Sequence, residues 1–281
     1  MSMGVKQSLP VIETPKHKLA SALPTLLTFG NLAFGFLVIW MALSRRDQFF
    51  EDSGKFFTML GLLLMVACLC DFLDGFVARK LNTTSPLGLE LDSLADLVSF
   101  GVAPVVVFYV CLFDEKPGVF SFVACLGYIL AGAFRLARFN NSASTPGKPN
   151  SHFEGLPITG ASIFWVALLL FLGRGRGNIL FEGHETGMRR FAIFVFAALG
   201  LLMISRFPYR SLKTPLNKSR HIKRELVLLG LLGGLVIARF GLETAIILVP
   251  ILYIFGTPLV NFWKKLHPKE NKDLDFLKRP E

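Results

Sequence analysis

Charged residues are scarce in this sequence. Of its 281 residues only 18% are charged, whereas 52% are hydrophobic, and the mean hydropathy is +0.53. A soluble protein of this length would be expected to form two domains with a more charged surface. A membrane protein built of helices accounts for both values without further assumptions. We therefore expect an all-α, polytopic integral membrane protein.

Cysteine is sparse as well, and the common phosphate-binding loops are absent. The four cysteines, Cys68, Cys70, Cys111 and Cys125, lie in or near apolar runs, and the first two lack CxxC spacing. We interpret all four as small buried apolar side chains and expect no disulfide framework. No Walker sequence or dinucleotide fingerprint occurs, so a phosphate site would have to be carried by helices. We expect no cleavable signal peptide at the polar N-terminus.

The net charge of +10 gives information about the binding partner. A basic soluble domain could bind nucleic acid, but no such domain is visible in the sequence. Basic residues of membrane proteins gather in cytoplasmic loops beside anionic lipid. We therefore expect a lipid bilayer as the partner of this charge, and no nucleic acid.

About eight apolar segments approach the length that a bilayer crossing requires. They cover roughly residues 23–43, 56–77, 88–112, 119–139, 158–172, 191–204, 226–238 and 242–260, the seventh being short for a full crossing. We predict a tail at 1–21, a core of six spans at 22–213, a helical hairpin at 214–262 and a charged tail at 263–281.

Four aspartates stand between the second and third apolar segments: Asp71, Asp74, Asp92 and Asp96. The first two are three residues apart and the last two are four apart, so each pair shares one face of a helix. A stretch with turn character at about 80–86 joins the two helix ends. Carboxylates set between membrane-grade segments are costly to keep, which makes them functional candidates.

The turn should bring these carboxylates close together. Because like charges repel, such a group needs positive charge beside it. Hard oxygen ligands suit Mg²⁺, Mn²⁺ or Ca²⁺. A metal site of this kind can stabilise the attacking and leaving oxygens of a phosphoryl transfer. The plainer interpretation, solvated loop charges at a membrane surface, is disfavoured by the regular spacing of the acids among small residues.

The charge distribution predicts which side of the membrane this turn faces. An even number of spans places both termini on one side. More than twice as many Lys and Arg residues fall on that side, which includes the turn, as on the other. The positive-inside rule then places the turn at the cytoplasmic face. We expect the cell (inner) membrane as the location.

The same stretch resembles the signature of the CDP-alcohol phosphotransferases. Asp71-x-x-Asp74-Gly75-x-x-Ala78-Arg79, then eight residues, then Gly88-x-x-x-Asp92-x-x-x-Asp96, matches every fixed position at the family spacing. The resemblance implies the helical membrane fold of that family. It also implies a reaction in which an alcohol attacks the phosphorus of a CDP-linked donor and CMP leaves.

The resemblance assigns roles by motif position. Asp71, Asp74 and Asp92 would bind a divalent metal, Mg²⁺ or Mn²⁺. Asp96 would be the general base on the acceptor hydroxyl and would also contact metal. The other motif residues expected in the CDP pocket, together with Asp71 and Asp74, are Gly75, Ala78, Arg79 and Gly88.

Two polar residues of the first apolar segment, Thr28 and Asn31, are three residues apart and share a helix face. Two interpretations are open. The first is hydrogen bonding between helices, which polar residues in membrane spans commonly provide. The second is a place in the nucleotide site, and on that interpretation we include Asn31 among the CDP-binding residues.

Arg135 and Arg138 end the fourth apolar segment, again three residues apart. Their side chains could snorkel to lipid headgroups. Alternatively they could bind a phosphate or carboxylate, since Arg favours planar bidentate pairing. A zwitterionic acceptor would need a cation for its carboxylate, so we expect Arg135 and Arg138 to bind the acceptor.

Three further stretches bear on the acceptor. LPTLLTFGNLAFGF, RLARFN with FEGLPITGAS, and MISRFPYRSLK resemble the phosphatidylserine synthases of the superfamily. That likeness implies CDP-diacylglycerol as donor and L-serine as acceptor. The family is commonly dimeric, so a homodimer is a further expected partner. Glycerol phosphate or inositol phosphate as acceptor, and a transporter with an acidic metal site, remain alternatives.

Overall fold

The structure is a computed structural model that describes residues 15–45, 52–81, 83, 85–113, 118–143, 152–176, 185–210, 248 and 250–256. Its elements in chain order are α1 (Pro15–Ser44), α3 (Ser53–Leu81), α4 (Pro86–Asp96), η1 (Leu97–Val102), α5 (Ala103–Phe108), η2 (Tyr109–Phe113), α6 (Val119–Ala143), β1 (His152–Glu154), α7 (Ile158–Phe171), η3 (Leu172–Arg176), α9 (Glu185–Ile204) and β2 (Pro208–Arg210). The η elements are π-helical.

The helices confirm an all-α integral membrane protein. By length and composition, the spans long enough to cross a membrane are Ala22–Ser44, Ser53–Leu81, Pro86–Phe113, Val119–Asn141 and Thr186–Ile204. A shorter apolar helix covers Ile158–Arg174. These correspond to the first six predicted segments. The seventh lies outside the described residues, and of the eighth only a helical stretch at 248–256 is described in part.

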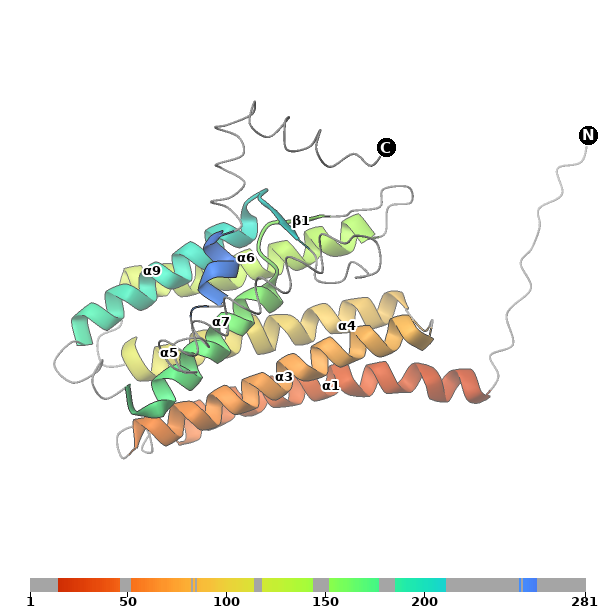
Figure 1. The fold of residues 1–281 in the computed structure, drawn as a ribbon, viewed down its shortest axis with the longest axis horizontal. Coiled ribbons are helices and arrows are strands. Elements are labelled where there is room, and N and C mark those ends of the chain that lie inside the picture. The colour runs from red at the N-terminus through yellow and green to blue at the C-terminus, as the bar shows by residue number, and fades with distance from the viewer. Residues whose placement is uncertain are drawn as a thin grey trace, which may run out of the picture.

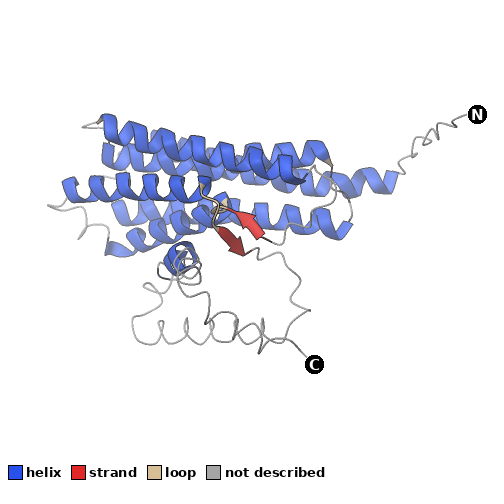
Figure 2. Cartoon of the chain, turned by 90° about the horizontal axis from the view of Figure 1, so that it is seen from above, coloured by secondary structure: helices blue, strands red, loops and turns tan. Residues whose placement is uncertain are grey.

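Two pairs of helices enclose a central layer. In Figure 1, α1 and α3 lie side by side along one side of the bundle, and α6 and α9 lie side by side along the other. The continuous rod from α4 to η2 and the helix α7 lie between the two pairs. Figure 2 shows the long helices running nearly parallel, with the two short strands beside them. The turn from α3 to α4 lies at one end of the bundle (Figure 1).

Local sequence sets that turn. α3 ends at Leu81 with Arg79 and Lys80 in its last turn, where cations favour the negative end of the helix dipole. Ser85 caps α4, because its Oγ accepts a hydrogen bond from the Gly88 N–H at 3.0 Å. Pro86 occupies the first turn of α4, where a missing N–H is tolerated. Helix end and helix start are thereby fixed close together.

The third span is not a regular α-helix. Two π-helical stretches, η1 and η2, flank the short helix α5, and Pro104 lies in the first turn of α5. Because the rod is continuous, both this proline and the π-helical turns interrupt the regular α-helical hydrogen-bond ladder. η1 begins directly after Asp96. π-helical turns are rare and occur often at functional sites, so this position points to the carboxylates.

An aromatic cluster forms the middle of the core. Trp165 of α7 is fully buried, with its ring centroid 4.6 Å from that of Phe196 and 5.0 Å from that of Phe108. Its indole N–H donates to the Tyr128 hydroxyl at 2.9 Å, which donates to the Phe100 carbonyl at 2.9 Å. Buried Trp and Tyr need such partners for their polar ends. The chain of contacts joins the central layer to α6 and α9.

Large apolar side chains cover the outside of the bundle. The exposed ones on α1, α3, α6 and α9 include Phe36, Trp40, Leu69, Phe72, Phe120, Phe122, Phe194 and Leu201. In water so many exposed aromatic and aliphatic groups would make an aggregating surface. In a bilayer they face the acyl chains, as the composition of the sequence predicts.

A two-stranded sheet, which the sequence did not predict, joins two of the stretches associated with the acceptor. β1 pairs antiparallel with β2, with Phe153 opposite Tyr209. The chain continues from β1 through Gly155, whose φ of 81° is a left-handed conformation that glycine adopts readily. The Gly155 N–H donates to the Phe207 carbonyl at 2.9 Å and the Leu156 N–H donates to the Leu202 carbonyl at 3.0 Å. Backbone hydrogen bonds therefore join the stretch FEGLPITGAS (153–162) to the stretch MISRFPYRSLK (203–213).

Gly35 marks a close approach of α1 to η1, and it generates a prediction about stability. A Cβ at this position would overlap the backbone and side chain of Ser99. We expect Gly35→Ala to push α1 away from η1 and to lower the free energy of unfolding by about 1–3 kcal/mol. The melting temperature of the protein purified in detergent measures the effect.

The matched control is Gly127→Ala on α6, where an added Cβ meets nothing within 4 Å. It should leave the melting temperature unchanged or raise it slightly, because Ala favours the helix over Gly. A similar loss of stability in both variants would contradict a special role for the contact at Gly35.

Candidate active site

The turn between α3 and α4 brings three carboxylates together. Oxygens of Asp71, Asp74 and Asp92 all lie within 4.8 Å of one another. Asp74 is buried and the other two are half-buried. α3 contributes Asp71 and Asp74, which share one face because they are three residues apart, and α4 contributes Asp92. Three anionic groups at this distance favour a bound cation, and an all-oxygen set suits a hard divalent one. The donor set therefore fits the predicted metal.

Asp96 stands apart from this group, one helical turn further along from Asp92. Its side chain is buried, with a relative exposure of 5%, and its electrostatic neighbours include Asp71 and Asp92. Asn31 of α1 donates a hydrogen bond from Nδ2 to Asp96 Oδ1 at 3.1 Å. Asp96, the predicted base, is thus not one of the three grouped acids, but it is a near neighbour of that group.

α1 supports two of the four acids. Thr28 Oγ1 lies 2.8 Å from Asp74 Oδ2 and 3.1 Å from the Pro24 carbonyl, and its single proton can be donated to one of them at a time. One turn later Asn31 reaches Asp96. Thr28 and Asn31 therefore both bond to other helices, which is the first of the two interpretations left open by the sequence. Contact of Asn31 with the nucleotide stays a prediction.

The other motif residues lie around the same turn. A Cβ at Gly75 would meet Arg79 Nη1 at 3.1 Å, so the guanidinium folds back over the helix at Gly75. The Ala78 carbonyl accepts a hydrogen bond from the Thr83 N–H at 3.0 Å. Gly88 approaches the capping serine. The residues predicted to line the CDP pocket are thus gathered at one end of α3 and α4. Their contact with CDP stays a prediction.

The two arginines that the sequence placed on one helix face have different partners in the structure. Arg135 is buried, and its guanidinium lies 5.5 Å from the centroid of the Phe139 ring. Its electrostatic neighbours are Asp96, Arg138, Tyr253 and Asp71, so it belongs to the surroundings of the carboxylates. This position makes Arg135 the stronger candidate for the acceptor.

Arg138 is engaged elsewhere. Its guanidinium donates to the carbonyls of Met203 and Ile204 at 3.3 Å and to that of Ser205 at 3.4 Å. These carbonyls lie at the end of α9, where a helix leaves acceptors without intrahelical partners and where a cation is favoured. Arg138 therefore ties α6 to the end of α9 beside Gly155.

One further neighbour, Tyr253 in the helical stretch at 250–256, was not predicted from the sequence. Its ring centroid lies 6.0 Å from that of Tyr209, and a Cβ at Gly160 would meet its Cε1 at 3.4 Å. The Tyr209 hydroxyl donates to the Ile254 carbonyl at 2.9 Å. Burial raises the pKa of Tyr209 above its usual range, so the hydroxyl keeps its proton. The C-terminal stretch is thereby held next to Arg135.

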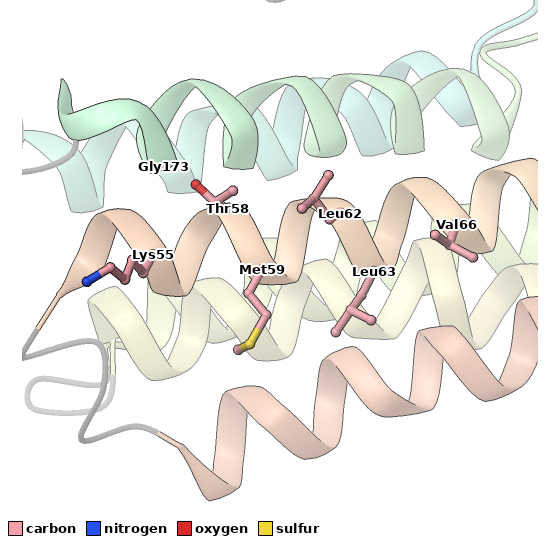
Figure 3. A pocket seen from close by; sticks show the side chains of 7 residues that line it. All are labelled: Lys55, Thr58, Met59, Leu62, Leu63, Val66 and Gly173. Atoms are coloured by element: carbon pink, nitrogen blue, oxygen red, sulfur yellow. The ribbon is translucent and has the colours of Figure 1, made fainter.

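A hollow on the bundle surface is not part of this site. Its volume is about 480 Å³, and Figure 3 shows its lining of α3 side chains, which with Gly173 are Lys55, Thr58, Met59, Leu62, Leu63 and Val66. Val66 precedes Asp71 by more than one helical turn. None of the predicted site residues lines the hollow, and its side chains are mainly apolar.

The comparisons with known proteins agree with the motif. The sequence profile of the family described as CDP-alcohol phosphatidyltransferase matches residues 21–204. A Helicobacter pylori (strain ATCC 700392 / 26695) protein named CDP-diacylglycerol--serine O-phosphatidyltransferase is 33% identical over 190 residues, which are 68% of this chain and 72% of that protein. Proteins of the same name from Saccharomyces cerevisiae (38% over 182 residues, 59% of each chain) and Bacillus subtilis (37% over 146 residues, 52% of this chain and 74% of that protein) are also similar.

The contact between Thr28 and Asp74 predicts an effect on metal binding. We expect Thr28→Val to weaken Mn²⁺ binding about 10- to 100-fold, because a ligand carboxylate loses the hydrogen bond that orients it. Asp74→Asn should weaken binding further, since it removes a charged ligand. A Mn²⁺ titration of the purified protein, followed by electron paramagnetic resonance, measures both.

Thr58→Val is the matched control for this experiment. Thr58 donates to the Gly54 carbonyl at 2.9 Å in the opposite half of α3, far from the carboxylates. Its replacement should leave Mn²⁺ binding unchanged. Wild-type binding by Asp74→Asn would show that the metal binds at another place.

Proposed function

The chain belongs to the CDP-alcohol phosphatidyltransferase family, and from that premise we propose that it transfers the phosphatidyl group of CDP-diacylglycerol to the hydroxyl of L-serine, giving phosphatidylserine and CMP. The observation that carries the proposal is the group of Asp71, Asp74 and Asp92 with Asp96 beside it. The similar proteins from three organisms, which share one name, support serine as the acceptor.

Phosphoryl transfer requires positioning and charge neutralisation more than covalent help from the protein. Asp71, Asp74 and Asp92 would hold the divalent cation, Mg²⁺ or Mn²⁺, which when bound neutralises the diphosphate of the donor. Asp96 takes the proton of the serine hydroxyl. The serine oxygen then bonds to the phosphorus that carries diacylglycerol. CMP departs with the electron pair of the broken phosphorus–oxygen bond.

Arg135 supplies a cation for the carboxylate of serine in this proposal. It is buried near Asp96, and a guanidinium can pair with a carboxylate through two parallel hydrogen bonds. A phosphate-bearing acceptor would require more positive charge. Arg138, its neighbour on the same helix, is bound to carbonyls of α9, which favours serine over glycerol phosphate or inositol phosphate.

The position of the site suits substrates that arrive from two phases. The carboxylates lie in the halves of the second and third spans that adjoin the turn at one end of the bundle, and the sides of the bundle are apolar, so a lipid donor can approach from the bilayer and serine from water. The charge bias of the loops supports the cytoplasmic face of the cell (inner) membrane. We also propose residues 22–213 as the catalytic core and a homodimer as the assembly, the latter on the likeness to the family.

An acceptor assay tests the proposal. Protein purified in detergent is given CDP-diacylglycerol with Mn²⁺ or Mg²⁺ and is then offered serine, glycerol phosphate or inositol phosphate. We expect CMP release that depends on serine. Asp96→Asn should lower kcat by at least about 100-fold, because it removes the general base.

The control for Asp96→Asn is Asp52→Asn, at an exposed position near the start of α3, where the carboxylate pairs with Lys55 at 2.9 Å. Its kcat should match the wild type. CMP release with a different acceptor would replace serine within the same reaction class. No release with any acceptor would favour a transporter with an acidic metal site.

The different partners of the two arginines predict different defects. Arg135→Lys should raise the KM for serine about tenfold and leave the KM for CDP-diacylglycerol nearly unchanged, because Lys keeps the charge but loses the planar fork. Arg138→Lys should lower the melting temperature and should leave both KM values nearly unchanged. Steady-state kinetics and thermal unfolding of both variants check this. Equal rises in both KM values for Arg135→Lys would count against a role in acceptor binding.

A further inference from the structure

The orientation of one buried amide extends the proposed function, on which the following inference rests. We propose that Asn31 Oδ1 binds the ammonium group of the acceptor. Asn31 would then be a specificity-determining residue that distinguishes amino alcohols from alcohols without an amine next to the reacting carbon.

Two contacts fix Asn31. Its Nδ2 donates to Asp96 Oδ1 at 3.1 Å, and its backbone carbonyl accepts a hydrogen bond from Ser99 Oγ at 2.9 Å. The residue is fully buried, with a relative exposure of 0%. Gly35, one turn further along α1, allows α1 to approach η1 closely. The side chain therefore has little freedom to move away from the base.

The contact with Asp96 also fixes which way the amide points. A carboxylate only accepts hydrogen bonds, so the nitrogen of the amide must face Asp96 and the oxygen must point elsewhere. That oxygen is buried, and within the described part of the chain no group donates to it. A buried acceptor without a donor is unfavourable and rare in native proteins. A substrate group is therefore the expected donor.

The geometry selects the part of the substrate that can reach this oxygen. The amide nitrogen and oxygen share one carbon, so a molecule whose hydroxyl lies at Asp96 can place the substituent of its next carbon against Asn31 Oδ1. In serine that substituent is an ammonium group, which has three donors and no acceptor. The surrounding aspartates favour a cation at this place. The carboxylate on the same carbon can then extend towards Arg135.

This assignment moves Asn31 from the CDP pocket, where the sequence placed it, to the acceptor side. The hydrogen bond to the predicted base is the reason, since that base acts on the acceptor. Two effects of replacing Asn31 follow. Loss of Nδ2 should slow turnover of any acceptor, because Asp96 is no longer held. Loss of Oδ1 should affect only acceptors that carry the amine.

The experiment measures kcat/KM for L-serine and for 3-hydroxypropionate, which is serine without its amine, using CDP-diacylglycerol and Mn²⁺. We expect the wild type to prefer serine strongly and Asn31→Leu to reduce that preference about tenfold. The ratio of the two values on one preparation is independent of how much protein is folded. Asn31→Ser, which is smaller and polar, provides a second variant with less risk to the fold and should reduce the preference in the same direction.

Thr28→Val is the matched control, because Thr28 lies on the same face of α1 and bonds to Asp74 instead of Asp96. It should leave the preference for serine unchanged even if it slows turnover. An unchanged preference in both Asn31 variants, or a rise in the KM for CDP-diacylglycerol without a change in preference, would overturn the inference. Failure of the wild type to release CMP with serine would instead overturn the proposed function, and it would be seen before any variant is compared.

Discussion

Hydrogen bonds from α1 hold acidic side chains inside a bundle whose outer surface is apolar. Asp74 and Asp96 are both buried, and a carboxylate in such a place is very unfavourable unless donors or cations compensate it. Thr28 and Asn31 provide donors at a three-residue spacing. Gly35, four residues later on the same face, lets α1 come close enough for those donors to reach. The hydrogen bonds to the buried acids therefore depend on the close packing of α1 at Gly35.

The surroundings of the carboxylates divide into two parts. α1, α3 and α4 supply the four aspartates and their donors, and they form the part that suits a metal and a diphosphate. α6 supplies Arg135, and the sheet of β1 and β2 holds the stretch with Tyr253 against it. Asn31 lies at the boundary, since it bonds to Asp96, the acid that we propose as the general base.

Much of this arrangement could be predicted from the sequence, because the bilayer imposes simple rules. Apolar length identified five spans and the shorter apolar helix Ile158–Arg174, since a hydrocarbon layer sets the length of a helix that crosses it. Helical periodicity brought Asp71, Asp74 and Asp92 together. The partners of Arg138 could not be predicted, because they are backbone carbonyls that every sequence contains. Tyr253 was missed because periodicity does not tell which distant segment returns to a site. The π-helical turns have no simple sequence signal either.

The position of α1 has a consequence for biogenesis. Translation proceeds from the N-terminus, and segments made first can assemble first. Thr28 and Asn31 therefore enter the membrane before the aspartates that need them, so α3 and α4 meet their hydrogen-bond donors as they insert. All four acids and both donors are present once the chain has been made as far as Phe113. Arg135 and the C-terminal stretch are made later. The buried acids, whose charges are the most costly, therefore lie in a part of the bundle that can assemble before those segments are made.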